Sequence, residues 1–131
     1  MRREISCNYL WKKWESNDPN GKQVLQARDK INNYSKKNWD DMVIDAQETM
    51  HRIGLLIDNS VDIRSKESED AFDKLLDHVD KYFFTVDKDY VDKLYLATFF
   101  DKDYVKFFDQ FKPGMANKIL ELIDAYPTKF K

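Results

Sequence analysis

The stretch from Tyr95 to Tyr126 constrains the fold most, because it predicts two amphipathic helices that meet at a sharp corner. Before the corner, four aromatic residues recur at the i, i+3, i+4 and i+7 spacing of one helix face: Tyr104, Phe107, Phe108 and Phe111. After the corner at 112–114, the same spacing is repeated by Ala116, Ile119, Leu120 and Ile123. We expect Pro113 at the first position of the second helix, where the N–H that proline lacks would have no intrahelical partner. Two apolar faces set at an angle need further helices to cover them.

The rest of the chain supplies those helices. Ser35 is a good N-cap, and Tyr34 before it can pack on Trp39 as a hydrophobic staple. Ser65 is a second cap. Apolar spacing predicts helices over residues 22–33, 35–58, 66–84 and 89–100, and another after Asp101. The chain has only three Gly and three Pro and no strand-like alternation of any length, so we predict an all-α bundle of about five to six helices.

The length and composition of the chain are those of a single domain of ordinary size. A chain of 131 residues can bury one core, and 42% apolar with 35% charged residues is typical of a soluble globular protein. The single cysteine excludes an internal disulfide and favours a reducing compartment. No signal-peptide h-region and no apolar run long enough to span a membrane is found, so we expect a cytoplasmic protein without membrane contact.

We expect a basic arm at 1–21 and a folded body at 22–131. Residues 1–37 carry nine Lys and Arg against four Asp and Glu, whereas residues 38–131 carry thirteen against twenty. An acidic body is a poor nucleic-acid binder, because phosphate contacts need a broad basic face. The arm also holds Trp11 and Trp14, outside any strong helical stripe. It either docks on the acidic body or stays mobile, and its tryptophans suggest a lid over a ligand.

No motif points to catalysis or to a bound metal. Glu48 and His51 match half of a di-iron carboxylate motif, but the second histidine, His78, has Leu75 where its glutamate would stand. A haem-ligating role for His78 lacks a second haem feature, and a partly buried histidine with a hydrogen-bonded tautomer is the better interpretation. No nucleophile–base arrangement and no phosphate-binding glycine loop is present. We expect a protein that is not an enzyme and has no cofactor.

Two further features bear on the interior. Aromatic residues make up 15% of the chain, which suits a site for a bulky, partly apolar ligand, although core packing explains most of them. Gly54, inside the 35–58 helix, suggests a close helix crossing.

Several segments in order resemble the TipAS antibiotic-recognition domain. They are the run from Tyr34 to Trp39 (YSKKNW), then His78, then Asp103-Tyr104 and Phe108-Asp109, and finally Lys112 to Ala116 (KPGMA). The resemblance extends from about Trp14 to Tyr126.

The resemblance implies a globin-like, haem-free helical fold that binds bulky drugs, thiopeptides above all, in an aromatic cleft. In the family this module is usually the effector domain of MerR-type transcription activators, with N-terminal helices that order around the ligand. The chain has no room for the DNA-binding winged helix, so we expect either a standalone drug-resistance protein or a fragment of a regulator. The loop at 85–88 has no cysteine, so covalent capture is not expected.

The leading hypothesis is non-covalent binding of a multi-ring small-molecule or peptide antibiotic. Eight candidate ligand-binding residues follow from the stripes and the resemblance: Trp11, Trp14, Trp39, His78, Tyr82, Tyr90, Tyr95 and Phe99. The aromatic rings would stack on the ligand, and His78 and the tyrosine hydroxyls would orient it. The alternative is a regulatory module whose aromatic groove binds a helix of a protein partner.

Overall fold

The computed structural model describes residues 12–16 and 18–127, and within them it is all-helical. A short helical segment covers 12–16. The other helices are α2 (Lys22–Asn32), α3 (Lys36–Asp58), α4 (Lys66–Tyr82), α5 (Lys88–Phe100), α6 (Lys102–Asp109) and α7 (Met115–Ala125). The predicted fold class is confirmed, and the predicted helices agree with the observed ones to within two residues at most ends. No helix among the described residues is both long and apolar enough to cross a membrane.

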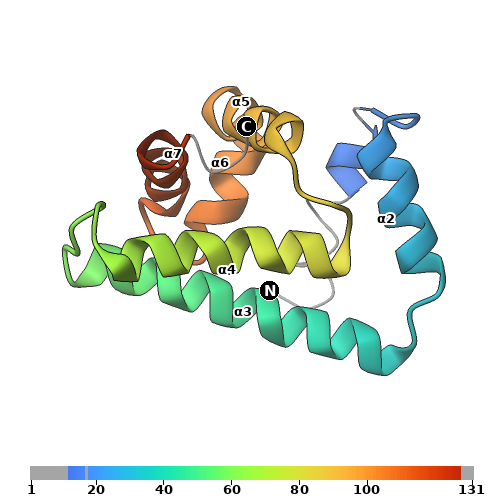
Figure 1. The fold of residues 1–131 in the computed structure, drawn as a ribbon, viewed down its shortest axis with the longest axis horizontal. Helices are drawn as coiled ribbons and strands as arrows, with labels where there is room; N and C mark the ends of the chain where they lie inside the picture. Colours follow the sequence, from blue (N-terminus) through green and yellow to red (C-terminus); the bar gives the residue numbers. More distant parts are fainter. Residues whose placement is uncertain (1–11, 17, 128–131) are drawn as a thin grey trace.

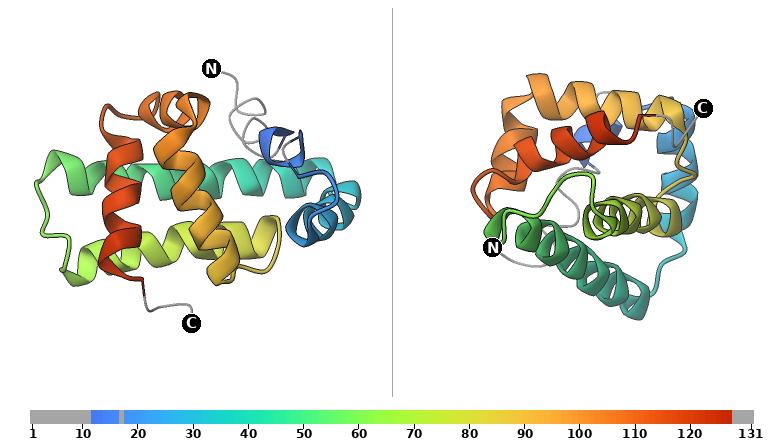
Figure 2. Two further views of the ribbon diagram at one scale, coloured as in Figure 1. Left: turned by 90° about the horizontal axis from the view of Figure 1, so that it is seen from above. Right: turned by 60° about the vertical axis from the view of Figure 1, so that its left-hand side comes forward.

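The helices form two layers. The two longest, α3 and α4, lie side by side and antiparallel, and they make the most extensive contact between any two helices of the described chain. Helices α5 and α7 cross over this pair at a steep angle, and α6 connects them along one edge (Figures 1 and 2). Helix α2 stands against the end of α4, so that the bundle is covered on that side too (Figure 1).

The start of α3 shows why the sequence places a helix there. The Ser35 side chain accepts a hydrogen bond from the Asn38 backbone N–H, and the Asn38 side chain accepts one from the Ser35 N–H. This capping box satisfies donors that no helical carbonyl can reach. The rings of Tyr34 and Trp39 meet edge to face, with centroids 5.7 Å apart, which is the predicted staple.

The corner between α6 and α7 differs from the prediction. Pro113 is not the first helical residue: α7 begins at Met115, and its N-cap is Gly114 with φ of 90°. Only glycine adopts this left-handed conformation without a steric penalty. Pro113 therefore lies in the turn, and Gly114 makes the sharp change of direction that the sequence required.

Gly54 is also explained differently from the prediction. A Cβ atom built on it would lie 3.6 Å from the Lys112 Cδ and 3.9 Å from the Met115 Cε, which are ordinary contact distances. The helices therefore do not cross so closely that glycine is required.

The described end of the arm docks on the body, as the charge distribution suggests. Lys13 forms ion pairs with Asp103 at 2.8 Å and with Asp101 at 3.2 Å, at the junction of α5 and α6. Trp14 packs against the core between the α4–α5 loop and α5, with its ring 5.3 Å from that of Tyr90.

Candidate functional site

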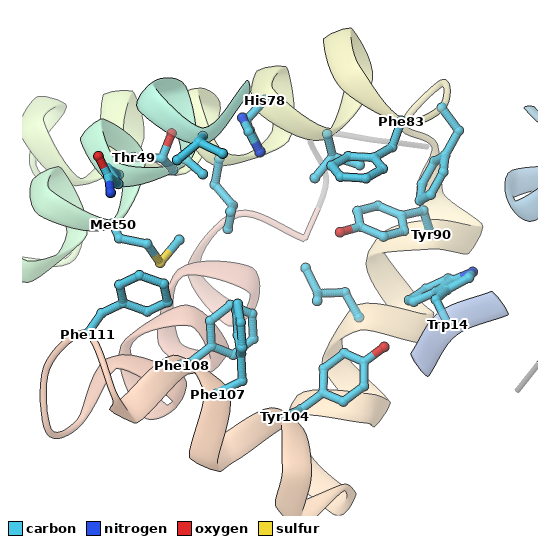
Figure 3. Close-up of a pocket in the computed structure, with 17 residues that line it drawn as sticks. Trp14, Thr49, Met50, His78, Phe83, Tyr90, Tyr104, Phe107, Phe108 and Phe111 are labelled. Carbon is cyan, nitrogen blue, oxygen red and sulfur yellow. The ribbon is translucent and has the colours of Figure 1, made fainter. Parts of the chain in front are cut away.

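A cavity of about 150 Å³ lies where the two layers and the 12–16 segment meet. Its walls come from α3, α4, the α4–α5 loop, α5, α6 and the following turn, and they are mostly apolar (Figure 3). Eight aromatic residues line it: Trp14, Phe83, Phe84, Tyr90, Tyr104, Phe107, Phe108 and Phe111. Cavities with such walls suit flat, apolar groups, because aromatic rings offer both contact area and stacking.

One wall of the cavity carries a buried histidine that is held by a carboxylate. The Nδ1 atom of His78, on α4, lies 2.6 Å from the Asp45 Oδ2 on α3, and the Lys74 Nζ lies 3.0 Å from the other oxygen of Asp45. Burial lowers the pKa of His78 below its ordinary value, although the Asp45 carboxylate acts in the opposite direction. Burial alone would raise the pKa of Asp45, but the hydrogen bonds from His78 and Lys74 together lower it.

These charges determine what His78 offers to a ligand. At pH 7 the imidazole is neutral and Asp45 is ionised, so Nδ1 carries the hydrogen and donates a hydrogen bond to the carboxylate. The other nitrogen, Nε2, is then a hydrogen-bond acceptor, and it lies on the cavity side of the ring (Figure 3). A buried acceptor on an apolar wall favours a ligand with an N–H or O–H group at that point.

Tyr90 supplies another polar group of the cavity. Its ring is packed between Phe84, at 5.0 Å, and Trp14, and its hydroxyl points into the cavity (Figure 3). Burial, together with the nearby Tyr104, raises the pKa of Tyr90, so the hydroxyl stays protonated at physiological pH. It is therefore able to donate or to accept a hydrogen bond.

Comparison with known proteins places this geometry in a family. The family model of the TipAS antibiotic-recognition domain matches residues 10–126. The chain belongs to this family. A solved structure of TipAS from Streptomyces lividans, in complex with the thiopeptide antibiotic nosiheptide, has a similar fold: the TM-score is 0.75, the identity is 19%, and the match covers 90% of this chain and 84% of that chain. Among curated proteins, none matches this chain. The resemblance inferred from the sequence is thus confirmed, as is the helical fold it implied.

Three of the eight predicted residues line the cavity of this TipAS-family domain: Trp14, His78 and Tyr90. They come from the N-terminal segment, α4 and α5, so the structure brings together residues that are far apart in the sequence (Figure 3). Trp11 lies outside the described residues.

The other four predicted residues lie outside the cavity. Trp39 packs on Tyr34 in the hydrophobic staple at the start of α3. The Tyr34 hydroxyl donates a hydrogen bond to the backbone carbonyl of Tyr82, at the end of α4. Tyr95 and Phe99 stack on each other on the outer side of α5, and Phe99 is 56% exposed. None of these four side chains lines the cavity, so their contact with a ligand stays a prediction.

Several lining residues of the TipAS-family domain are not among the predicted ones, chiefly Thr49, Met50, Phe107, Phe108 and Phe111. The aromatic members were recognised as one face of the helix before the corner, but they were interpreted as filling the core. Their helical spacing predicts a face that points inward. Only the packing of the neighbouring helices shows that a cavity remains beside this face.

Among residues 12–16 and 18–127, no group of three or more His, Cys, Asp and Glu is placed to hold a metal ion. Glu48 instead lies 3.8 Å from the Lys74 Nζ, and His51 is exposed on α3.

Proposed function

We propose that this chain is a non-enzymatic, cytoplasmic binding domain for multi-ring antibiotics of the thiopeptide kind. The observation that carries the proposal is the aromatic cavity whose polar wall groups include His78 Nε2 and the Tyr90 hydroxyl, on opposite layers of the bundle. The solved relative in complex with nosiheptide supports the ligand class. The domain acts either alone or as the effector part of a MerR-type regulator.

The cavity is smaller than a drug-sized ligand, so binding requires part of its wall to move. Sites for drug-sized ligands occupy roughly 300–1,000 Å³, whereas this cavity has about 150 Å³. A ligand of that size must therefore displace part of the wall. The 12–16 segment is the part most easily displaced, because it is held by Trp14 packing and by surface ion pairs of Lys13 and of Glu15 with Arg28. Exposed ion pairs contribute little to stability.

The alternative, a groove for a partner helix, is less well supported. A helix with its side chains is roughly 10–12 Å wide, so a cavity of about 150 Å³ has no more room for a helix than for a whole antibiotic. The solved relative in complex with nosiheptide favours the antibiotic.

The test is titration with nosiheptide, followed by melting temperature and by tryptophan fluorescence. Trp11 and Trp39 are replaced by Phe, so that Trp14 is the sole reporter among the three tryptophans. Ligand at about 100 times its Kd stabilises the folded state by about 2.7 kcal/mol, which raises the melting temperature by several degrees. We expect this rise together with a change in Trp14 emission. The melting temperature is measured on the wild-type chain, which keeps Trp11 and Trp39. An unchanged value at saturating nosiheptide would contradict the proposal.

A further inference from the structure

A second hollow adjoins the aromatic cavity and shares a wall with it. This groove, of about 640 Å³, runs between α3 and the turn that joins α6 to α7. Three residues line both spaces: Gln47 and Met50 of α3, and Phe111 of the turn. The cavity alone is too small for a drug-sized ligand, whereas the groove lies within the usual range of volumes.

The partition between the two spaces is made of side chains that move easily. Met50 is 9% exposed and unbranched, with rotatable bonds that let it adopt several shapes at low cost. Phe111 follows α6, is 37% exposed, and packs edge to face on Phe107 with centroids 5.5 Å apart. Since more than a third of Phe111 already faces water, rotating it outward loses less buried area than rotating a fully buried ring would. A ring that enters the cavity would replace the contacts that Met50 and Phe111 lose.

The groove differs chemically from the cavity. Its polar wall groups are the side-chain amides of Gln47 and Gln110 and the imidazole of His51, and one end is closed by the ion pair of Asp58 with Lys112. Amide side chains both donate and accept hydrogen bonds, so they complement the N–H and C=O groups of a peptide backbone. Apolar surface is supplied by Leu55, which is 41% exposed.

We propose that cavity and groove form one two-part site. An aromatic ring of the ligand enters the cavity past Met50 and Phe111, while an amide-rich, peptide-derived chain lies along the groove between α3 and the α6–α7 turn. This inference rests on the proposed function and extends it, because it names the surface that holds the part of the ligand for which the cavity has no room.

The test compares two neighbouring substitutions on α3 by calorimetric titration with nosiheptide. His51→Trp puts a large ring into the groove from an exposed position, so we expect nosiheptide to bind at least about tenfold more weakly, which corresponds to about 1.4 kcal/mol. Arg52→Trp is the matched control: it lies at the next position, is exposed, and does not line the groove. It should bind nosiheptide as the wild-type chain does. Gln110→Trp fills the groove from the opposite wall and guards against a folding defect in the first variant.

A second probe separates the groove from the cavity. Benzene fits an apolar cavity of about 150 Å³, and its entry is followed by the methyl NMR signal of Met50. The chain has only four methionines, so this signal is readily assigned. Benzene binding should be the same in the wild type and in His51→Trp.

The outcomes distinguish this inference from the proposed function. Nosiheptide binding that is equally tight in the wild type, His51→Trp and Gln110→Trp would overturn the two-part site and leave the proposed function standing. Absence of nosiheptide binding in the wild type would overturn both.

Discussion

The Nδ1 atom of His78 lies 2.6 Å from the Oδ2 of Asp45, and this contact joins α4 to α3 at the wall of the cavity. The bond sets which nitrogen of His78 is protonated, so Asp45 acts on the cavity without lining it. Lys74 holds the second oxygen of Asp45 and completes the arrangement.

Replacing Asp45 with Asn should weaken both folding and ligand binding. The change removes a charge-assisted hydrogen bond from a partly buried group, which costs about 1–2 kcal/mol of unfolding free energy. Without the Asp45 carboxylate, the hydrogen of His78 is no longer fixed on Nδ1, and Nε2 is no longer always an acceptor. The affinity for nosiheptide should therefore fall about fivefold. Urea unfolding at pH 7 and calorimetric titration measure the two effects. Asp41→Asn, on the same helix, is the control, because its partner Lys37 forms only a surface pair. Similar losses in both variants would contradict the assigned role of Asp45.

His78 should make the unfolding free energy of the domain decrease as the pH falls. Burial lowers the pKa of His78 in the folded state. As the pH falls through about 6.5, the unfolded chain binds a proton that the folded chain does not, so stability decreases. Glutamine takes up no proton, and His78→Gln should therefore lose less stability than the wild type between pH 7.5 and about pH 5.5, a window above the usual carboxylate range. Urea unfolding across this range makes the comparison. Parallel curves for the two proteins would refute the prediction.

Trp14 should contribute more to the docking of the 12–16 segment than Lys13 does. The centroid of its ring lies 6.1 Å from that of Phe84 and 5.3 Å from that of Tyr90. Trp14 is partly buried and packs against the core. Because Trp14 is only partly buried, Trp14→Ala should cost about 2 kcal/mol of unfolding free energy, below the range for fully buried tryptophan.

Lys13→Ala should change stability little, since its ion pairs with Asp101 and Asp103 are at the surface. Limited proteolysis of the segment before α2 provides a second readout. If Lys13→Ala is cleaved faster than Trp14→Ala, the segment is held by charge and not by packing.

Two glycine-to-alanine changes should act in opposite directions. Gly114 has φ of 90°, and an alanine in that conformation costs about 1–2 kcal/mol. Gly54 lies inside α3 with room for a methyl group, so Gly54→Ala should raise the unfolding free energy by up to about 1 kcal/mol. Thermal unfolding of the two single variants tests the pair. A stabilised Gly114→Ala would mean that the α6–α7 corner does not need the left-handed residue.

Much of the fold was predictable from the sequence because its signals are local. Helix periodicity identified the inward faces of α3, α4, α6 and α7. Ser35 and Ser65 marked helix starts, since their hydroxyls accept from the backbone N–H groups of Asn38 and Ser68. The error at Pro113 has a local cause too: proline suits both a turn and the first helical position, and Gly114 decided between them.

The site was less predictable, since a cavity is a property of how faces meet. The sequence by itself determined most of the side chains that point inward, and it indicated the buried histidine and the docking of the arm on the body. Only the tertiary structure decided that Phe107 and Phe111 border a space, whereas Tyr95 and Phe99 do not line it and Phe99 is exposed. It also decided that Asp45 reaches His78 across 33 positions of the chain. Periodicity within one helix reports its own buried stripe, but an unfilled volume depends on the crossing angles and side-chain sizes of several helices together.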